Sequence, residues 1–489
     1  MAGDGAIGRA MRALERGATR AGACRARPRF HFLPRSGWMN DPNGTLFHEG
    51  AYHLFYQHNP YRPRWGRIHW GHARSRDLVH WEHLPIALAP GGGVAERHCF
   101  SGCCAIADDG TPTLLYTRIG LASLLSMARC WADQCAAFGD AELVAWRKHP
   151  GNPVLRESAH RGARIRHWRD PYVFREAGDW YLVLAGLEPG EPSGSVLLYR
   201  SQTLLEWEYR GRLASGDPSL DRGIECPNYF ELGDRRVLLV SPYGPVRYRV
   251  GEFQNERHIG GTWRSFDHGR AFYATQTFAD DRGRTIVVGW IRGPRGDGWA
   301  GCLSLPREVR LGREDALSIE PVRELESLRR DHRRIEVAVG PDGGSAIAGA
   351  TFPERAVEFR ARYEVSSAGA CGFEIRSGAD RHRFAIDLRR GVIASGAEEA
   401  TLSFPIDARA FELRAFLDAS VLEVFAGGCE AFTSVVPFAS KQAGPVEIVP
   451  FASGGSGRVR ADFWRLASIG IDGTEHGSGI PAPTHGTSE

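Results

Sequence analysis

The chain has 489 residues, of which 42% are hydrophobic, 24% charged and 10% aromatic, and this is the composition of a folded globular protein. Its 61 lysines and arginines against 58 aspartates and glutamates leave a formal net charge of +3, which gives no electrostatic footprint for nucleic acid or for an anionic membrane. No apolar run approaches the ~20 residues that a membrane-spanning helix needs. We therefore expect a small or neutral partner, no nucleic acid and no membrane.

The first 27 residues are rich in arginine, alanine and glycine, and Asp4 and Glu15 interrupt them. They contain no apolar core of the about 7–15 residues that a secretory signal peptide needs. We therefore expect residues 1–27 to form an extension without regular order, and the protein to be cytoplasmic. The ten cysteines form no CxxC pair, so we expect reduced thiols in a large core, without a metal site or a cofactor.

One hairpin pattern recurs five times: an apolar residue, a short turn rich in glycine and aspartate, and a run of β-forming residues. The copies are residues 47–57, 106–117, 174–185, 230–241 and 278–290. A second pattern alternates with the first and contains Trp81, Trp146 and Trp207, which are 65 and 61 residues apart. A unit of this length holds about four strands, and five such units arranged radially form a five-bladed β-propeller. We predict that the propeller spans residues 28–323 and that the three tryptophans pack between strands.

The pattern changes after residue 310. Residues 324–334 read as a short charged linker, and residues 335–469 contain short strands with turn signals, which favour a β-sandwich. Glycine, threonine, serine, proline and histidine dominate residues 470–489, so we expect a disordered tail. The predicted fold is therefore all-β, a five-bladed β-propeller followed by a C-terminal β-sandwich.

Three acidic residues precede the hairpins at similar distances. Asp41 lies six residues before the first hairpin, Asp170 four before the third and Glu225 five before the fourth. If the hairpins are equivalent, the three carboxylates converge on one mouth of the central channel. The same position holds residues 101–102 in the second unit and 274–276 in the fifth. An Asp-Pro pair alone is more simply a turn, but three acids in register weigh against that interpretation.

Paired carboxylates that face a neutral substrate suggest glycoside hydrolysis. One acid protonates the leaving oxygen and the other attacks or activates water, around an oxocarbenium-like transition state. A third, ionised acid can stabilise the positive charge that develops on the ring. Trp38, Trp65 and Trp299 could stack on sugar faces, although core packing is the simpler explanation for any one of them.

At these motifs the chain resembles glycoside hydrolase family 32, the invertase and fructan-hydrolase family, over residues 28–465. The shared motifs are WMNDPNG (38–44), YHLFYQHNP (52–60), HWGHARSRDLVHWE (69–82), FSG (100–102), NPVL (152–155), RDP (169–171), EC (225–226), FYATQTF (272–278), GWAGCLSLPREV (298–309) and LDASVLEVFAGG (417–428). The resemblance implies a five-bladed propeller with a C-terminal sandwich.

The resemblance also implies roles for the acids. Asp41 would be the nucleophile that forms a fructosyl-enzyme intermediate, Glu225 the general acid and then base, and Asp170 the transition-state stabiliser. The mechanism would be retaining, with the carboxyl groups of Asp41 and Glu225 about 5–5.5 Å apart. Because Glu225 must hold a proton while Asp41 stays ionised, we expect Glu225 to be the more desolvated of the two.

Six positions with polar or aromatic side chains resemble residues that bind the fructosyl unit in the family, and we add their neighbours Trp38 and Phe100. The predicted substrate-binding set is Trp38, Asn40, Gln57, Trp65, Phe100, Ser101, Arg169 and Trp299. For Arg169, a structural salt bridge is the alternative. The chain departs from the family pattern at residues 96–104 and 116–120, which places the leaving-group subsite in question. Cys99, Cys103 and Cys104 in that region read as packing thiols.

The sequence thus favours a β-fructofuranosidase that acts on sucrose, a short fructo-oligosaccharide or sucrose 6-phosphate. A fructosyltransferase would use the same acids, and a non-catalytic carbohydrate-binding propeller would not need all three. The complete WMNDPNG motif disfavours a related inverting hydrolase that acts on arabinan or xylan.

Overall fold

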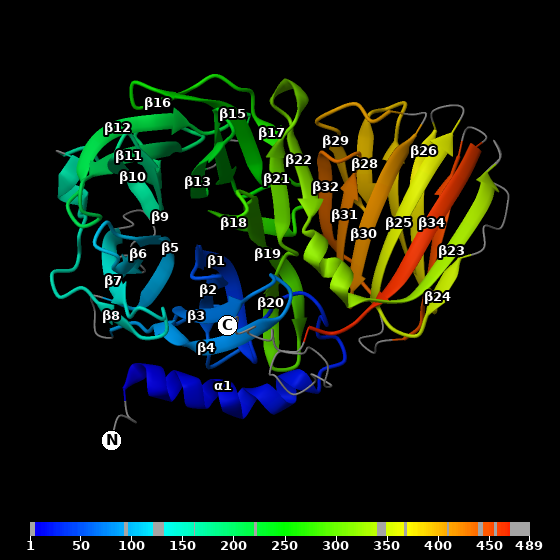
Figure 1. The fold of residues 1–489 in the computed structure, drawn as a ribbon, viewed down its shortest axis with the longest axis horizontal. Helices are drawn as coiled ribbons and strands as arrows, with labels where there is room; N and C mark the ends of the chain where they lie inside the picture. Colours follow the sequence, from blue (N-terminus) through cyan, green and yellow to red (C-terminus); the bar gives the residue numbers. More distant parts are fainter. Residues whose placement is uncertain are drawn as a thin grey trace, which may run out of the picture.

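The computed structural model describes residues 5–91, 96–120, 132–160, 162–219, 223–339, 349–365, 369–407, 410–438, 444–453 and 457–469. Figure 1 shows a ring of small sheets beside a two-layered β-structure, with one helix below the ring. The architecture confirms the predicted five-bladed β-propeller and C-terminal β-sandwich.

The blades are antiparallel meanders that follow one another along the chain, because short turns connect neighbouring strands. The first blade contains β1 (Gly37–His48), β2 (Ala51–Asn59), β3 (His69–Ser75) and β4 (Trp81–Leu88). The second contains β5 (His98–Ile106), β6 (Pro112–Ile119), β7 (Ala132–Gly139) and β8 (Trp146–Lys148). The short helix η1 (Glu157–His160) precedes the third, with β9 (Arg166–Glu176), β10 (Asp179–Leu187), β11 (Ser195–Ser201) and β12 (Glu208–Ser215).

The last two blades carry extra strands. The fourth contains β13 (Glu225–Leu232), β14 (Arg235–Ser241), β15 (Arg247–Gln254), β16 (Arg257–Ile259) and β17 (Arg264–Ser265). The fifth contains β18 (Phe272–Ala279), β19 (Thr285–Gly296), β20 (Trp299–Leu303), β21 (Arg307–Leu311) and β22 (Leu317–Pro321), with the short helix η2 (Arg313–Asp315). Each predicted hairpin pairs the innermost strand of a blade with the next strand outward.

The ring closes between the first and the last blade. The innermost strands β1, β5, β9, β13 and β18 contact one another in a cycle. Strand β20 also pairs in parallel with β1, through Gly37 opposite Trp299 and Trp38 opposite Ala300. The first and fifth blades therefore form one continuous sheet, which fixes β1 at the centre of the ring.

The repeated tryptophans have a common structural role, as the second pattern predicted. Each indole N–H donates to the carbonyl of the residue three positions earlier, at 3.2 Å for Trp81, 2.9 Å for Trp146 and 3.0 Å for Trp207. The residue that accepts this bond is a leucine with positive φ in all three cases. The rings pack against the hydrophobic core clusters, so these tryptophans close the turn before an outer strand.

The sandwich consists of two six-stranded sheets, ordered β23-β34-β25-β30-β31-β32 and β24-β33-β26-β27-β28-β29. Their strands are β23 (Arg329–Val339), β24 (Ala350–Phe352), β25 (Ala356–Val365), β26 (Ala370–Ser377), β27 (Asp380–Asp387), β28 (Val392–Ser395), β29 (Glu398–Thr401), β30 (Phe411–Asp418), β31 (Val421–Ala426), β32 (Glu430–Val435), β33 (Val446–Ala452) and β34 (Gly457–Leu466). The predicted linker at 324–334 is wrong in detail, because η3 (Arg323–Leu328) runs directly into β23. The predicted disordered tail at 470–489 lies outside the described residues.

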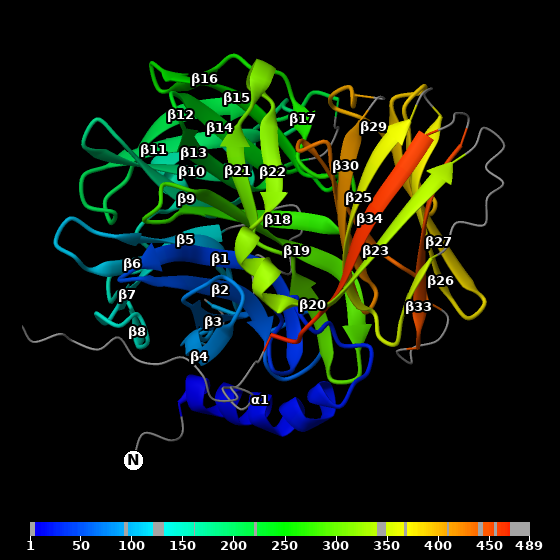
Figure 2. The same cartoon turned by 45° about the vertical axis from the view of Figure 1, so that its right-hand side comes forward.

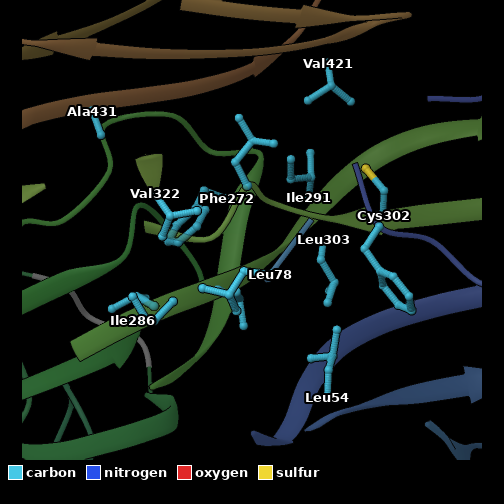
Figure 3. Close-up of a cluster of buried hydrophobic side chains, with 14 of the residues drawn as sticks. Leu54, Leu78, Phe272, Ile286, Ile291, Cys302, Leu303, Val322, Val421 and Ala431 are labelled. Carbon is cyan, nitrogen blue, oxygen red and sulfur yellow. The ribbon is translucent and has the colours of Figure 1, made fainter. Parts of the chain in front are cut away.

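One hydrophobic cluster contains residues of both domains. Figure 3 shows Phe272 and Ile291 of the fifth blade near Val421 and Ala431 of the sandwich. All four side chains are buried and belong to the same cluster. The sandwich therefore stabilises the blade that stands next to β1 in the ring, since burial of apolar surface at the junction favours the docked arrangement.

Residues 5–27, the described part of the N-terminal extension, contain a helix, contrary to the prediction that the extension lacks regular order. Helix α1 (Ala6–Gly22) lies along the base of the propeller and contacts β4, as Figures 1 and 2 show. Its alanines, leucine and arginines favour a helix, and Ala10 and Leu14 pack on Ile86 of β4. No helix among the described residues is long and apolar enough to cross a membrane. Ile7, Ala10, Met11 and Leu14 recur at helical spacing, and the packing of this apolar face on β4 orders the extension.

Candidate active site

All five innermost strands carry a β-bulge near their first residues, where two residues oppose one residue of the neighbouring strand. The bulged pairs are 40–41 in β1, 100–101 in β5, 170–171 in β9, 226–227 in β13 and 274–275 in β18. A bulge bends its strand and changes the direction of the side chains. Because neighbouring innermost strands contact one another, the bulges form a ring at one end of the channel, which we call the mouth.

The three predicted acids meet at this mouth. The backbone N–H of Cys226 donates to Asp170 Oδ2 at 3.0 Å. The Cys226 sulfur lies 3.7 Å from Asp170 Oδ2 and 3.8 Å from Asp41 Oδ2. Glu225 precedes Cys226 in the chain, so three strands that are distant in sequence place three carboxylates around one thiol.

The acids do not occupy identical positions in their strands. Asp41 is the second residue of its bulge, Asp170 is the first, and Glu225 comes directly before its bulge. Asp170 has φ of 66° and Cys226 has φ of 46°, both in a region that residues other than glycine rarely adopt. Strained backbone of this kind collects at functional sites, where the surrounding structure holds it.

Arg169 links two of the acids. Its Nη2 donates to Glu225 Oε1, and its Nε lies 3.6 Å from Asp170 Oδ2. The other Glu225 oxygen, Oε2, accepts a hydrogen bond from the Tyr273 hydroxyl at 2.6 Å. The Tyr243 hydroxyl lies 2.6 Å from Arg169 Nη2. The salt-bridge alternative for Arg169 is therefore what the structure shows.

The electrostatics of the mouth differ from the expectation that Glu225 is the more desolvated, protonated acid. Burial raises the pKa of Asp170 to about 7, against the charge of Arg169. Burial also raises the pKa of Asp41, with the charge of Glu225 adding to the shift and a hydrogen bond from Ser101 opposing it. For Glu225, burial is outweighed by Arg169 and by the hydrogen bond from Tyr273, so its pKa lies below the usual range. The contact with Arg169 therefore favours the ionised form of Glu225.

Asp41 sits in a set of hydrogen-bond donors that fix both of its oxygens. Its Oδ2 accepts from the Ser101 hydroxyl at 2.6 Å and from Gln57 Nε2 at 3.0 Å. Its Oδ1 accepts from Asn40 Nδ2 at 3.0 Å. The Trp38 indole N–H orients Asn40 by donating to Asn40 Oδ1 at 2.8 Å. The predicted polar residues are therefore gathered around Asp41 and hold its carboxylate in one orientation.

Aromatic side chains form a wall beside this carboxylate. Trp65 is 48% exposed, and its ring stacks on His98 with centroids 4.9 Å apart. Phe100 meets Trp65 edge-on at 6.2 Å, and it directly precedes Ser101. The exposed, supported face of Trp65 is suited to stack on the apolar face of a sugar ring.

Trp299 does not belong to the mouth. It is 1% exposed and lies in the hydrophobic core with Phe30 and Met39, because β20 pairs with β1 and turns this ring inward. The sugar-binding prediction for Trp299 is therefore corrected, and packing explains it. A different tryptophan, Trp290 of β19, contacts the Trp38 ring at 5.8 Å, and its indole N–H has no hydrogen-bond partner among the described residues.

Sequence reasoning missed Trp290 as well as Tyr273 and Tyr243. All three lie beside residues that it did find, but they come from hairpin segments that read as ordinary strands or turns. The signal that could have found Tyr273 and Trp290 is their pairing across the fifth hairpin, where they stand opposite each other.

A hollow of about 320 Å³ opens next to Glu225, between the third and fourth blades. Its lining residues are His167, Gly186, Leu187, Gly223, Ile224 and Tyr243. Tyr243 joins it to the carboxylates through Arg169. None of these lining residues carries a carboxylate, and Leu187 and Ile224 give the hollow apolar walls.

The unusual segment at 96–104 contains a buried ion pair behind the mouth. Glu96 accepts hydrogen bonds from Lys148 Nζ at 2.5 Å and from the Tyr116 hydroxyl at 2.9 Å. Cys99 and Cys103 are buried, and burial raises the pKa of Cys103 to about 12. These cysteines are therefore packing thiols, as predicted. The part of the chain that the structure describes contains no group of three His, Cys, Asp or Glu side chains placed to hold a metal ion.

Comparison with known proteins agrees with this architecture. Residues 31–321 match the N-terminal domain of glycosyl hydrolases family 32, and residues 324–465 match the C-terminal domain of that family. A sucrose-6-phosphate hydrolase of Zymomonas mobilis is 35% identical in an alignment 439 residues long, which covers 82% of this chain and 84% of the relative.

Solved structures give the same result. The family 32 β-fructofuranosidase of Bombyx mori is 29% identical, with a TM-score of 0.79 over 94% of this chain and 98% of the other. A mutant of that enzyme, 28% identical with a TM-score of 0.77 over 94% of this chain and 97% of the other, was solved in complex with sucrose. The chain therefore belongs to glycoside hydrolase family 32 and is an enzyme of the β-fructofuranosidase type.

Proposed function

We propose that the enzyme hydrolyses terminal β-fructofuranosyl bonds with retention, through a covalent fructosyl intermediate on Asp41. The observation that carries this proposal is the mouth itself, where three carboxylates and one arginine surround a small space. Relatives named sucrose-6-phosphate hydrolase support sucrose or sucrose 6-phosphate as the substrate.

Asp41 is suited to be the nucleophile because its donors fix it in place. Hydrogen bonds from Asn40, Gln57 and Ser101 orient both oxygens. In the first step an Asp41 oxygen forms a bond to the anomeric carbon of the fructosyl unit, the bond to the leaving oxygen breaks, and Glu225 gives that oxygen a proton. In the second step Glu225 takes a proton from water, the water oxygen attacks the same carbon, and Asp41 is released as a carboxylate.

Glu225 needs a proton for the first step, yet Arg169 favours its ionised form in the free enzyme. We infer that substrate hydroxyls take over hydrogen bonds of Arg169 when the sugar binds. Loss of that ion pair raises the pKa of Glu225, so that it can hold the proton that the leaving group requires. Arg169 then acts as a fructosyl-binding residue, in accordance with its predicted role.

Asp170 is suited to stabilise positive charge on the ring in the transition state. It is the most enclosed of the linked acids, with its side chain 6% exposed against 21% for Glu225. A carboxylate in such a site interacts strongly with an oxocarbenium-like ring because little water screens it. The pKa of about 7 implies that this role weakens as the pH falls below neutrality.

The test is to incubate the enzyme with sucrose, sucrose 6-phosphate, 1-kestose, inulin and levan and to measure free fructose and the released leaving sugar. For sucrose and sucrose 6-phosphate, equal amounts of fructose and of the leaving sugar are expected for a hydrolase, and an excess of the leaving sugar would indicate a fructosyltransferase. With methanol present, retention predicts methyl β-fructofuranoside as a second product. The α-anomer of that product, or no release of fructose from any of these compounds, would overturn the proposal.

A further inference from the structure

Arg292 stands at the mouth end of the fifth blade, two residues after Trp290. Its backbone N–H donates to the carbonyl of Ala271 at 2.8 Å, at the point where β18 begins. Its guanidinium lies over the ring of Tyr273, with 4.2 Å between Cζ and the ring centroid. Tyr273 in turn donates to Glu225. Arg292 is therefore separated from the acid that faces the leaving oxygen by a single aromatic ring.

The two arginines of the mouth differ in their partners. Arg169 is already engaged by Glu225 and Asp170. Arg292 donates to the carbonyl oxygen of Arg270, and no carboxylate among the described residues forms an ion pair with it. Glu398, an acid of the sandwich, accepts instead from the backbone N–H of Arg270 at 3.1 Å.

The environment of Arg292 makes its charge available. Burial lowers the pKa of its guanidinium, while Tyr273, Glu225 and Asp41 act in the opposite direction. An arginine has five N–H donors, and stacking on an aromatic face leaves the edges of the guanidinium plane open for further hydrogen bonds. A partly buried cation with donors to spare is a good site for an anion, because little solvent screens the attraction.

We propose that Arg292 is a specificity residue that binds a phosphate monoester on the leaving sugar. This inference rests on the proposed function, because it needs a fructoside in the mouth with its leaving group beyond Glu225. The guanidinium can form paired hydrogen bonds to two phosphate oxygens, whereas an uncharged hexose offers only single, neutral acceptors. The preferred substrate class is then a phosphorylated fructoside, and the neutral sugar is a weaker substrate.

The experiment compares kcat/KM for sucrose 6-phosphate and sucrose in the parent, Arg292→Lys and Arg292→Gln enzymes. We expect the parent to prefer the phosphorylated substrate. In the Gln variant the ratio of kcat/KM for sucrose 6-phosphate to that for sucrose should be about tenfold lower, because one charged contact is lost. The Lys variant keeps the charge, so it should keep part of the preference. Raising the salt concentration should weaken the preference in the parent and change it little in the Gln variant.

Arg264→Gln is the matched control. Arg264 also stacks on an aromatic ring, 4.7 Å from the Phe404 centroid, and also donates to a backbone carbonyl, that of Glu314 at 2.7 Å. It touches none of the mouth residues, so its substitution should leave the substrate preference unchanged. If Arg292 served only to support Tyr273, Arg292→Gln would lower kcat/KM for both substrates by the same factor, and that outcome would overturn the proposal.

A binding measurement separates this inference from the proposed function. Calorimetry with glucose 6-phosphate and with glucose is expected to show tighter binding of the phosphate ester to the parent, and loss of that difference in Arg292→Gln. A parent that hydrolyses sucrose but binds the two sugars equally would refute the role of Arg292 and leave the hydrolase assignment standing. A parent that binds glucose 6-phosphate through Arg292 but cleaves no fructoside would refute the hydrolase assignment and leave the anion-binding role of Arg292 standing.

Discussion

The molecule contains two buried clusters of charge that are built from similar parts. The mouth cluster consists of Asp41, Asp170, Glu225 and Arg169. The junction cluster, between propeller and sandwich, consists of His31, Asp267, Arg307, Asp418 and Glu423. Both have three carboxylates, but the junction cluster has two basic groups where the mouth cluster has one.

Each carboxylate of the junction cluster contacts Arg307 or His31. Arg307 contacts Asp267 at 2.8 Å and Glu423 at 2.5 Å, and all three side chains are 0% exposed. His31 bridges Asp418 at 2.8 Å and Glu423 at 2.9 Å. Burial lowers the pKa of His31, but the two acids outweigh it and bring the value to about 9. Arg307 and His31 outweigh the burial of Glu423 and lower its pKa, so this carboxylate is held in its charged form.

In the mouth cluster the single arginine contacts two of the three acids, Asp170 and Glu225, and Asp41 and Asp170 have raised pKa values. The comparison teaches that the number of opposite charges, rather than burial, distinguishes a structural from a reactive cluster here. The nearly matched charges of the junction cluster hold two domains in place, whereas the larger excess of carboxylate in the mouth cluster leaves a site that gains stability when a cationic transition state forms.

The largest effect is expected for Asp41→Ala. Removal of the proposed nucleophile should lower kcat for fructoside hydrolysis by about 10⁴ or more, measured as fructose release. The free energy of unfolding in urea should stay the same or rise, because one of three crowded carboxylates is gone. A large loss of stability would show that the mouth cluster stabilises the fold as the junction cluster does, and would contradict the comparison.

Asp418→Ala tests the other side of the comparison. The Asp418 carboxylate accepts hydrogen bonds from the backbone N–H groups of Phe30 at 2.8 Å and His31 at 3.0 Å, besides the His31 ring. Removing one partner of a buried pair typically costs about 3–5 kcal/mol. We expect a loss of this size in urea unfolding, with kcat of the folded enzyme within about threefold of the parent. Unchanged stability would show that the junction cluster does not hold the domains together.

The pH dependence of stability should show the contribution of His31. Its pKa is raised from 6.5 in the unfolded chain to about 9 in the folded protein. The stabilisation is therefore fully present below about pH 6.5 and is lost as the pH rises through about 9. The free energy of unfolding should therefore be lower at pH 9.5 than at pH 7. His31→Gln, which cannot titrate, should be flatter over this range, and an equal slope in both proteins would contradict the assignment.

The smallest effect is expected for Tyr273→Phe, which removes one hydrogen bond from Glu225 Oε2 and keeps the ring under Arg292. That hydrogen bond helps to keep the pKa of Glu225 low. Without it the basic limb of the kcat/KM profile should move to higher pH, by less than about one unit. A profile that keeps its shape while the rate falls would assign Tyr273 to packing alone.

Much of the fold was predictable because the hairpins and the tryptophan turns are local patterns. Each depends on residues within about a dozen positions of one another, so periodicity reveals it. The acids were found for the same reason, since their distances to the hairpins repeat. The mouth residues Asn40, Gln57 and Ser101 came from motif resemblance, and the structure places them on Asp41.

The remaining features depend on contacts between distant segments. Nothing near Glu225 in sequence reveals that Arg169, 56 positions away, holds its pKa low. The choice between Trp290 and Trp299 as the mouth tryptophan depends on how β20 meets β1. The LDASVLEVFAGG motif at 417–428 gains its meaning only from His31 and Arg307, more than 100 positions before it, because it supplies Asp418 and Glu423 to the junction cluster.

The closure of the ring also constrains the order in which a newly made chain can become active. Asp41 leaves the ribosome early, but its strand pairs with residues 299–300, and the sandwich holds the segment before it through contacts that include those of Asp418 and Glu423. Domains ordinarily fold as units while synthesis proceeds. Here the nucleophile's strand must wait until the sandwich has been translated, so nascent chains that stop short of residue 418 should accumulate without hydrolytic activity.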